Sequence, residues 1–414
     1  MLSFSKNNIF IEKISVADLA EKYGTPLYVY SETRLRENAN RLKTALKKHY
    51  PHSQLFYAVK ANNNPAILKI LQSEELGADA SCPAEIWLAE KAGFSKDKIL
   101  YSGVYNKDEE LRYGLKSKVA INLDAPSLLP RLLKIGKPPL ISFRINPGIG
   151  NSGAEKLIMA GPEARFGIFE KDALQCYADA KKAGIKRFGI HMMTGSNVLD
   201  PKYFPVVAEK LFDIAGKIAQ QVGITFEFID IGGGLGVPYR GEKELDVDQV
   251  ISEVAKVFQK KIKTYPLGNP KLMLEPGRYL VCNMGILLTR VTTIKKTKKT
   301  FVGIDAGFNT LLRPKLYDAY HEVLVDGQTT ATPCEKVSLC GPICENDDIL
   351  ARDRLLPKLK ENDLLVFKNA GAYGFGMSSQ YNSRPRSAEI MVKGNKARVI
   401  RKREEFEDLV RRCC

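Results

Sequence analysis

Long apolar runs, paired cysteines and clustered histidines are all missing from this sequence. No stretch approaches the roughly 20 apolar residues of a transmembrane helix, and the N-terminal segment lacks the apolar core of a signal peptide. The eight cysteines include no CxxC pair, and the four histidines are dispersed along the chain. These absences argue against a membrane protein, a disulfide framework and a metal site, and they favour a cytoplasmic location.

Also absent is any motif that would explain the net charge of +16 by nucleic-acid binding. The basic residues are spread over the whole chain, and the densest run, KKTKK at 295–299, lies between two strand-like segments. We predict that this run is the solvated tip of a hairpin. The charge then indicates a basic surface that attracts anionic substrates, with neither nucleic acid nor a membrane as partner.

Short strand-like runs alternate with longer amphipathic segments between residues 54 and 278. Two of these segments, 84–92 and 248–265, carry apolar residues at helical spacing. Repeated strand–helix units of this kind predict a (β/α)8 barrel, a fold of about 250 residues. The eight predicted strands are 54–62, 77–82, 99–103, 119–124, 140–147, 188–196, 226–234 and 271–278.

After Arg278 the pattern changes to strand-like runs separated by turns, which is typical of a mainly β domain. We therefore predict an α/β chain with an N-terminal segment (1–30), a barrel (31–280) and a C-terminal β domain (281–414). The run PLYVY at 26–30 is assigned to the β domain, with the barrel as the alternative. The predicted β-domain strands are 285–296, 300–307, 321–327, 335–342, 363–371, 387–392 and 397–401.

Four unusual features fall at the carboxyl ends of predicted barrel strands, where the catalytic groups of such barrels lie. Lys60 ends the first strand, and Gly195-Ser196, GGGLG (232–236) and EPGR (275–278) end the sixth, seventh and eighth. A lysine that closes a strand is usually a surface residue, but it can also form a Schiff base with a carbonyl. Glycines let backbone N–H groups approach phosphate oxygens, although GGGLG alone fits a tight turn equally well. A dinucleotide fingerprint is disfavoured, because Val237 stands where GxGxxG needs its last glycine.

Taken together, these features fit a cofactor with an aldehyde at one end and a phosphate at the other. Pyridoxal 5'-phosphate has both groups. Glu275 adds a carboxylate that can keep the pyridine nitrogen protonated, which makes the ring a strong electron acceptor. The alternative for Glu275 is an ion pair with Arg278.

Several longer motifs occur in a recognisable order along nearly the whole chain. They are FYAVKAN, DIGGGLGVPY, LEPGR, IDAGFNTLLRPKLYDAYHEV, CGPICENDD and GAYGFGMSSQYNSRPR. With these motifs the sequence resembles the diaminopimelate decarboxylase family, within the pyridoxal-phosphate enzymes of the alanine-racemase-like fold type. The resemblance implies a (β/α)8 barrel that binds the cofactor, a C-terminal β domain, and decarboxylation of meso-2,6-diaminopimelate to L-lysine, the last step of lysine biosynthesis. It also implies a homodimer whose active sites are shared between chains.

The resemblance implies roles for the residues at matching positions. Lys60 and Cys344 would be catalytic, with Lys60 bonded to the cofactor and Cys344 as the proton donor. The implied cofactor-binding residues are Lys60, Ser196, Gly233, Gly234, Glu275, Gly277, Arg278 and Tyr373. The implied substrate-binding residues are Arg278, Arg313, Tyr317, Glu345 and Tyr373.

The chemistry of this substrate agrees with those roles. Its second carboxylate needs a positive partner, and Arg313 with Tyr317 is a suitable clamp. Glu345 can accept the distal ammonium group, and the thiol of Cys344 can protonate the carbanion left by decarboxylation. Without the motifs, the simpler interpretations are a buried apolar cysteine at 344, surface packing at Arg313 and Tyr317, and a core aromatic at Tyr373.

One segment departs from the family pattern. The family usually has HxGS after its sixth barrel strand, and that histidine stacks on the cofactor ring. Here the segment reads HMMTGS, which places Met193 at the stacking position. A methionine thioether can pack against an aromatic ring. His191 lies two residues earlier, on the same side of the strand and one layer deeper.

Other functions compete with this interpretation. A related decarboxylase acting on ornithine, arginine, lysine or carboxynorspermidine is the first alternative, but Arg313 and Tyr317 argue against ornithine or lysine. The CGPICE and GAYGF segments argue against a racemase. A catalytically inactive regulatory protein is the alternative from another class, and the presence of both Lys60 and Cys344 argues against it.

Overall fold

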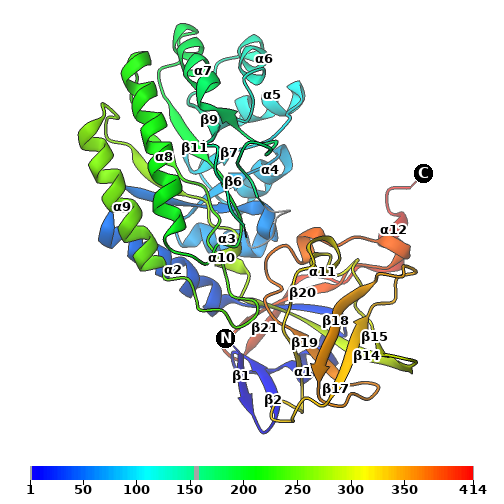
Figure 1. Cartoon of the computed structure of the whole chain (residues 1–414). Coiled ribbons are helices and arrows are strands. Elements are labelled where there is room, and N and C mark those ends of the chain that lie inside the picture. The colour runs from blue at the N-terminus through cyan, green and yellow to red at the C-terminus, as the bar shows by residue number, and fades with distance from the viewer. Residues whose placement is uncertain (1, 153–157, 414) are drawn as a thin grey trace. The chain divides into compact units, whose positions relative to one another are not determined.

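The computed structural model describes residues 2–152 and 158–413, which form two compact units (Figure 1). The barrel unit comprises residues 38–238 and 243–279. The β unit comprises residues 1–37, 239–242 and 280–414. Each unit therefore contains chain segments that are distant in the sequence. No helix in the described part of the chain combines the length and apolar character needed to span a bilayer.

Eight parallel strands close the barrel, and all eight are those predicted from the sequence. Around the ring each strand pairs with its neighbours, and β13 pairs with β5 to complete the circle. A two-residue strand, β10 (Ile168–Phe169), pairs with β9 from outside the ring. The ring strands are β5 (Ser53–Ala58), β6 (Gly77–Ala80), β7 (Ile99–Tyr101), β8 (Ala120–Leu123), β9 (Ile141–Asn146), β11 (Gly189–Met192), β12 (Phe228–Asp230) and β13 (Lys271–Leu274).

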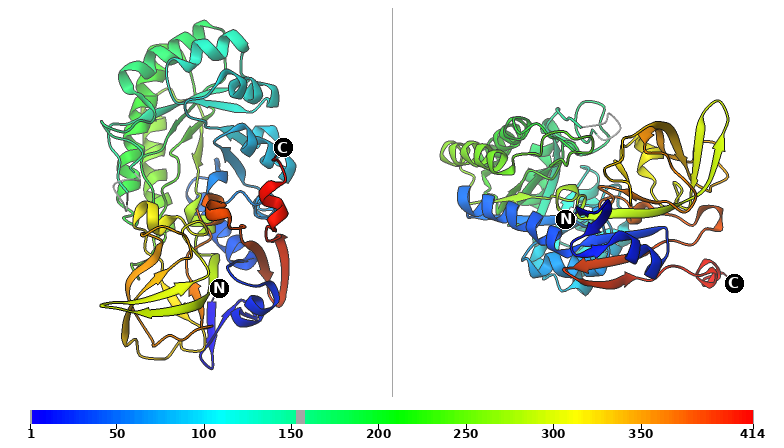
Figure 2. Two further views of the ribbon diagram at one scale, coloured as in Figure 1. Left: turned by 90° about the vertical axis from the view of Figure 1, so that its right-hand side faces the viewer. Right: turned by 90° about the horizontal axis from the view of Figure 1, so that it is seen from below.

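Helices surround these strands on the outside (Figures 1 and 2). In α9 the apolar residues recur at helical spacing, and the buried face includes Val250, Val254 and Phe258. The side chain of Asp246 caps this helix by accepting the backbone N–H of Gln249. The helices are α2 (Glu32–His49), α3 (Pro65–Ser73), α4 (Pro83–Ala92), α5 (Asp108–Ser117), α6 (Leu128–Ile135), α7 (Glu170–Lys182), α8 (Tyr203–Ile218) and α9 (Val247–Thr264).

The β unit is built on a long central strand, β14, which pairs with β4, β15 and β19. β4 lies between β14 and β20, so the N-terminal segment of the chain contributes a strand to the interior of this sheet. The sheet strands are β4 (Leu27–Ser31), β14 (Gly285–Lys296), β15 (Thr300–Ile304), β16 (Val323–Val325), β17 (Glu335–Cys340), β18 (Ile349–Leu356), β19 (Leu364–Phe367), β20 (Ala388–Lys393) and β21 (Lys396–Arg401).

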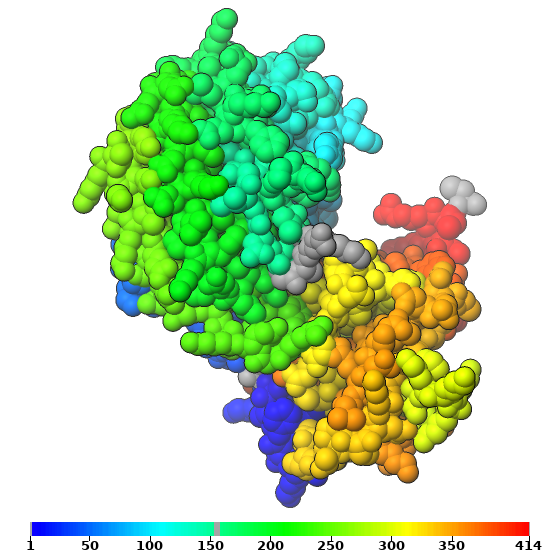
Figure 3. Space-filling view, viewed as in Figure 1, coloured from blue at the N-terminus to red at the C-terminus, as the bar shows by residue number. Residues whose placement is uncertain are grey.

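The basic run 295–299 forms the turn between β14 and β15, as predicted. Lys296 pairs with Thr300 at the end of this hairpin, and the lysines of the run are exposed. Figure 3 shows the hairpin in yellow-green at the molecular surface. The run is therefore the exposed tip of a hairpin, at which Lys296 pairs with Glu335 at 3.4 Å and Lys299 with Asp353 at 3.5 Å.

Two sets of strands in the β unit were not predicted. One is β18, and the other is a small antiparallel sheet formed by β1 (Leu2–Ser5), β2 (Asn8–Ile11) and β3 (Ile14–Ser15). Ile9 and Ile11 of the small sheet are buried in the same apolar core as β4 and β14. The remaining helices are α1 (Val16–Tyr23), α10 (Arg278–Val281), α11 (Arg313–Tyr317) and α12 (Phe406–Val410).

Candidate active site

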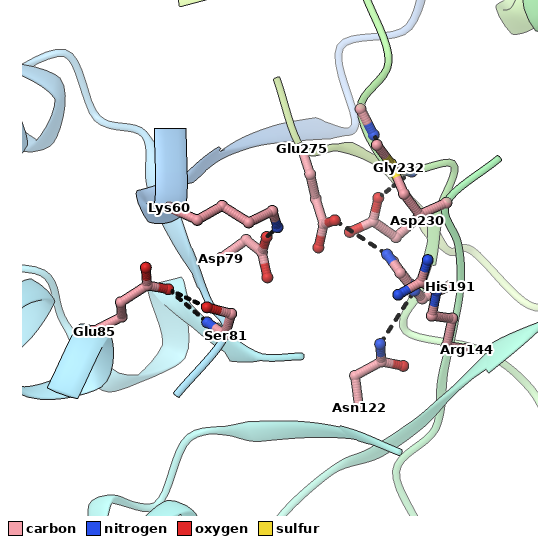
Figure 4. Close-up of polar contacts among 12 residues, drawn as sticks. Lys60, Asp79, Ser81, Glu85, Asn122, Arg144, His191, Asp230, Gly232 and Glu275 are labelled. Carbon is pink, nitrogen blue, oxygen red and sulfur yellow. Dashed lines mark hydrogen bonds and ion pairs between the residues drawn. The ribbon is translucent and has the colours of Figure 1, made fainter. Parts of the chain in front are cut away.

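Lys60 lies just beyond the carboxyl end of β5, on a single 3₁₀ turn, Val59–Ala61. The predicted strand, 54–62, therefore extends four residues beyond the observed end at Ala58, and Lys60 follows the strand instead of ending it. The strand ends because the following asparagines start a helix: the Asn64 side chain accepts the N–H of Ala66 and caps α3. The Lys60 side chain is 45% exposed, and its Nζ donates to Oδ2 of Asp79 at 2.8 Å. Asp79 lies on β6 and is fully buried. Figure 4 shows its carboxylate meeting the amine of Lys60.

Glu275 follows β13 and faces the interior of the barrel mouth (Figure 4). Its Oε2 lies 3.0 Å from Nε2 of His191, and Nδ1 of His191 lies 3.1 Å from Nδ2 of Asn122. Burial raises the pKa of Glu275, but the charge and hydrogen bond of His191, with the charge of Lys60, lower it below its ordinary value. Glu275 is thus a buried carboxylate that remains ionised.

Asp230, at the end of β12, has a raised pKa, whereas the pKa of Glu275 is lowered. Burial and the charge of Glu275 raise the pKa of Asp230 well above its ordinary value, although the N–H of Gly232 donates to its Oδ1 at 2.8 Å. The ligand atoms of His191, Asp230 and Glu275 lie within 4.8 Å of one another, close enough to hold a metal ion. We assign the group to the cofactor, because His191 and Glu275 already bond each other at 3.0 Å.

Buried oxygen atoms around Glu275 test whether pyridoxal phosphate fits this mouth. Glu275 Oε1, Asp230 Oδ2 and Asp79 Oδ1 are buried without a hydrogen-bond partner among the described residues. Leaving such an atom unsatisfied costs about 1–3 kcal/mol. A protonated pyridine nitrogen is a donor that satisfies Glu275 Oε1, so the residues present fit the ring of this cofactor.

The glycine-rich loop after β12 has the geometry that close backbone approach requires. Gly232 and Gly234 have φ angles of +73° and +93°, which side chains rarely adopt. A Cβ atom on Gly233 would lie 2.4 Å from the carbonyl oxygen of Glu275. Only glycine therefore leaves room here, and the loop can present N–H groups to a phosphate.

Ser196 and Arg278 meet beside this loop in the barrel unit. Nη2 of Arg278 donates to Oγ of Ser196 at 3.2 Å. Gly277 is buried, and it precedes Arg278 at the start of α10. The barrel unit thus brings together Lys60, Ser196, Gly233, Gly234, Glu275, Gly277 and Arg278 at the carboxyl ends of its strands.

Met193 is half-buried and follows the last residue of β11. The N–H of Gly233 points to its sulfur at 3.3 Å. A Cβ atom on Gly232 would lie 3.2 Å from the same sulfur. Met193 therefore packs against the glycine-rich loop, and His191 lies deeper in the barrel with 2% exposure.

The predicted substrate-binding residues belong to the β unit, and two of them lie on α11. Arg313 begins this helix and Tyr317 ends it. Arg313 is only 5% exposed, so the alternative of surface packing is wrong for this residue. Tyr317 is half-buried, and Tyr373 is half-buried with a φ angle of +55° in its turn.

Cys344 and Glu345 lie together on an exposed loop of the β unit. The alternative of a buried apolar cysteine is therefore wrong for Cys344. The loop is held by side chains on both sides: Asn382 Oδ1 accepts the N–H of Cys344 at 2.7 Å, and Tyr381 donates to Glu345 at 2.6 Å. The side chain of Asp348 accepts further backbone N–H groups at the base of the loop.

Several polar residues of the barrel interior were not predicted as part of the site. Arg144 is buried, and its Nη1 lies 3.7 Å from Oδ1 of Asp124. The central carbon of its guanidinium lies 4.6 Å from the centroid of the Phe166 ring. The residues missed are Asp79, Asn122, Arg144, His191 and Asp230. The sequence did contain a signal for them, because each places a polar side chain within an apolar barrel strand.

Known proteins similar to this chain agree on one family. The family model described as "Pyridoxal-dependent decarboxylase, pyridoxal binding domain" matches residues 34–282. A diaminopimelate decarboxylase of Methanothermobacter thermautotrophicus is 48% identical over 408 residues, covering 98% of this chain and 95% of the relative. One from Archaeoglobus fulgidus is 40% identical over 415 residues, covering 99% and 98%.

Solved structures give the same result. The diaminopimelate decarboxylase of M. jannaschii in complex with L-lysine superimposes with a TM-score of 0.90 at 31% identity, covering 100% of this chain and 98% of that one. The Helicobacter pylori enzyme with L-lysine gives a TM-score of 0.87 at 35% identity, covering 96% and 98%. A lysine/ornithine decarboxylase from Vibrio vulnificus shares the fold at 20% identity, with a TM-score of 0.78.

Proposed function

This chain belongs to the diaminopimelate decarboxylase family, and we propose that it converts meso-2,6-diaminopimelate to L-lysine and carbon dioxide at a site built around Lys60 and Glu275. The enzyme is a carboxy-lyase, and its cofactor is pyridoxal 5'-phosphate. Within the barrel, one observation carries the proposal: Glu275 is a buried, ionised carboxylate, and its Oε1 has no hydrogen-bond partner among the described residues. Lys60 lies at the same barrel mouth. An acceptor in that position fits the ring nitrogen of this cofactor.

Residues of the barrel unit would bind and orient the cofactor. When bound, pyridoxal phosphate takes up the electron pair that remains as the bond between carbon and the departing carboxylate breaks. The amine of Lys60 would bond its aldehyde carbon, and Glu275 would keep a proton on its ring nitrogen. The N–H groups of Gly233 and Gly234, with Ser196, would hold its phosphate.

Residues of the β unit would select the substrate and complete the reaction. Arg313 and Tyr317 would bind the distal carboxylate, and Glu345 the distal ammonium group. Cys344 would give its Sγ proton to the carbon that has lost carbon dioxide, so that one proton replaces one carbon dioxide. Arg278 and Tyr373 would contact both the cofactor and the substrate.

Cys344 and Glu345 also suggest how the protein assembles. Both side chains are exposed, and they lie beside Tyr381, an aromatic residue that is 45% exposed. A partner chain that covers this loop would bring the proton donor into a closed site. We therefore include in the proposal a homodimer in which each chain supplies Cys344 and Glu345 to the other. A cytoplasmic location is also proposed, because the seven described cysteines are free thiols, as a reducing compartment allows.

A direct assay tests the proposed reaction. Purified protein is incubated with pyridoxal phosphate and meso-diaminopimelate, and lysine and carbon dioxide are both quantified. Equal molar amounts of the two products are expected, and Lys60→Ala should give neither. Faster turnover of ornithine, arginine, lysine or carboxynorspermidine would replace this proposal with the related decarboxylase.

A further inference from the structure

His321 is completely buried in the β unit, next to the arginine proposed to bind substrate. Its Nδ1 lies 2.8 Å from the carbonyl oxygen of Lys368, and its Nε2 lies 2.9 Å from Nη1 of Arg313. A carbonyl oxygen only accepts hydrogen bonds, so Nδ1 must carry a proton. A guanidinium only donates, so Nε2 must be free of one. The two partners together assign His321 as neutral imidazole in one tautomer.

Arg313 has surroundings that keep its positive charge uncompensated. It is 5% exposed, and within the described part of the chain its guanidinium bonds a histidine and makes no ion pair with a carboxylate. Its guanidinium contacts His321 and the ring of Tyr239, whose centroid lies 4.7 Å from the central carbon of the guanidinium. Tyr239 in turn meets the edge of His321 at 5.5 Å.

A buried guanidinium whose neighbours are all neutral destabilises the protein unless an anion binds beside it and neutralises its charge. A carboxylate side chain at position 321 would itself neutralise Arg313 and remove its affinity for an anion. A neutral imidazole instead accepts one N–H and leaves the charge available. A neutral imidazole at position 321 therefore orients Arg313 and leaves its positive charge free to bind an anion.

We propose that His321 is a positioning residue that sets the orientation of Arg313 for the distal carboxylate of the substrate. The inference rests on the proposed function, since it deepens the role given there to Arg313. His321 acts through Arg313 and does not touch the reacting carbon. It should therefore control the affinity for ligands that carry the distal carboxylate, with little effect on the chemical step.

L-Lysine and 1,5-diaminopentane provide matched probes. L-Lysine, the product, keeps the carboxylate that the reaction does not remove, and 1,5-diaminopentane has no carboxylate. Calorimetric titration of the holoenzyme with each ligand isolates the contribution of that group. A hydrogen bond that holds a charged partner corresponds to roughly a tenfold to hundredfold change in affinity.

Two amide substitutions separate the two bonds of His321. In His321→Gln the amide reaches the position of Nε2 and can still accept from Arg313. In His321→Asn it reaches only the position of Nδ1 and can still donate to Lys368. We expect His321→Asn to weaken L-lysine binding by at least tenfold and to raise KM for diaminopimelate with kcat nearly unchanged. His321→Gln should restore most of the affinity, and neither change should alter the binding of 1,5-diaminopentane.

The outcomes distinguish this inference from the proposed function. If the wild type decarboxylates diaminopimelate but both variants bind both probes alike, His321 is only a core residue and the inference is wrong. If the wild type has no such activity, the proposed function itself fails. A measurement on the wild type tests the inference even if the variants do not fold. Nitrogen-15 NMR of the labelled histidines at pH 7 should show that His321 is neutral and carries its proton on Nδ1. An imidazolium or the other tautomer at this position would overturn the inference.

Discussion

Lys60 and Asp79 form an ion pair with a Nζ–Oδ2 distance of 2.8 Å, in which the lysine is 45% exposed and the carboxylate is fully buried. The amine is thus held at the barrel mouth by a group that solvent does not reach. A surface lysine that merely closes a strand has no need of such a partner. The pair places the amine beside Glu275, in the mouth where the proposed cofactor fits.

We predict that the purified protein is yellow and that borohydride reduction fixes the cofactor to Lys60. Lys60 is held by Asp79 at the barrel mouth, where its charge acts on Glu275, and a reduced adduct survives digestion for mass mapping. Lys43, which pairs with Glu74, is the control position and should remain unmodified. Mapping of the adduct to any other lysine would mean that the site is wrongly assigned.

Replacement of Gly233 by alanine should weaken cofactor binding by at least tenfold. The added Cβ would lie 2.4 Å from the carbonyl oxygen of Glu275, so the loop must shift away from its present position. Absorbance titration of cofactor-free protein measures the affinity. Gly136→Ala is the matched control, because its Cβ would lie at ordinary van der Waals distance, 3.5 Å, from the side chain of Leu115. Equal affinity in the two variants would exclude the loop from the phosphate site.

The raised pKa of Asp230 predicts a specific dependence of stability on pH. A carboxyl group whose pKa is higher in the folded state stabilises the fold at low pH and loses that contribution as the pH rises through the folded pKa. Asp230→Asn keeps an acceptor for the N–H of Gly232 and cannot ionise. The cofactor-free variant should therefore gain stability relative to wild type as the pH rises from about 5 to about 8.

Thermal unfolding at several pH values measures this difference. Asp347→Asn is the control, because the hydrogen bond with Lys315 lowers the pKa of Asp347 and this surface carboxylate stays ionised over the range. A stability difference for Asp230→Asn that does not change with pH would show that Asp230 is not held protonated beside Glu275.

Arg313→Ala should lose far more activity on diaminopimelate than on a substrate without the distal carboxylate. Loss of a charge-assisted bond costs about 1.5–3 kcal/mol, which corresponds to roughly a tenfold to hundredfold fall in kcat/KM. Lys315→Ala, which removes a neighbouring exposed cation paired with Asp347, is the control and should change both substrates equally and little. Equal losses on both substrates for Arg313→Ala would mean that Arg313 supports the fold and not the specificity.

The fold was largely predictable because the barrel strands are short apolar runs separated by clear helical periods. β18 was missed because its buried residues are interrupted by charged ones: Arg352, Asp353 and Arg354 lie in its middle. The sheet of β1 to β3 was missed because its strands have only two to four residues and are partly exposed. Pairing with distant chain segments stabilises both, and no local pattern records that pairing.

Site residues could be predicted only where the neighbouring residues in the sequence form a recognisable motif. The motif around Lys60 pointed to a reactive amine, but its partner Asp79 is 19 residues away in a segment read simply as a strand. His191 and Glu275 are separated by 84 residues, so their bond depends on two strands meeting in the ring. Such contacts follow from the closed barrel and not from spacing along the chain.

The last prediction concerns the proposed shared site. Lys60→Ala and Cys344→Ala should each be inactive, since one loses the cofactor-bonding amine and the other the proton donor. If each chain supplies Cys344 to its partner, a mixed dimer has one site with both residues mutated and one with both intact. Random exchange of subunits then restores activity to about a quarter of the sites.

A second mixture controls for nonspecific rescue in the same assay. Lys60→Ala and Glu275→Ala both alter the barrel unit, so every site of their mixed dimer lacks one of the two residues and no activity should return. Subunit exchange is verified with differently tagged chains, because a failure to exchange would also give no activity. When exchange is demonstrated and the Lys60→Ala and Cys344→Ala mixture stays inactive, Cys344 does not act across the interface. The proton donor must then come from the same chain or from another residue.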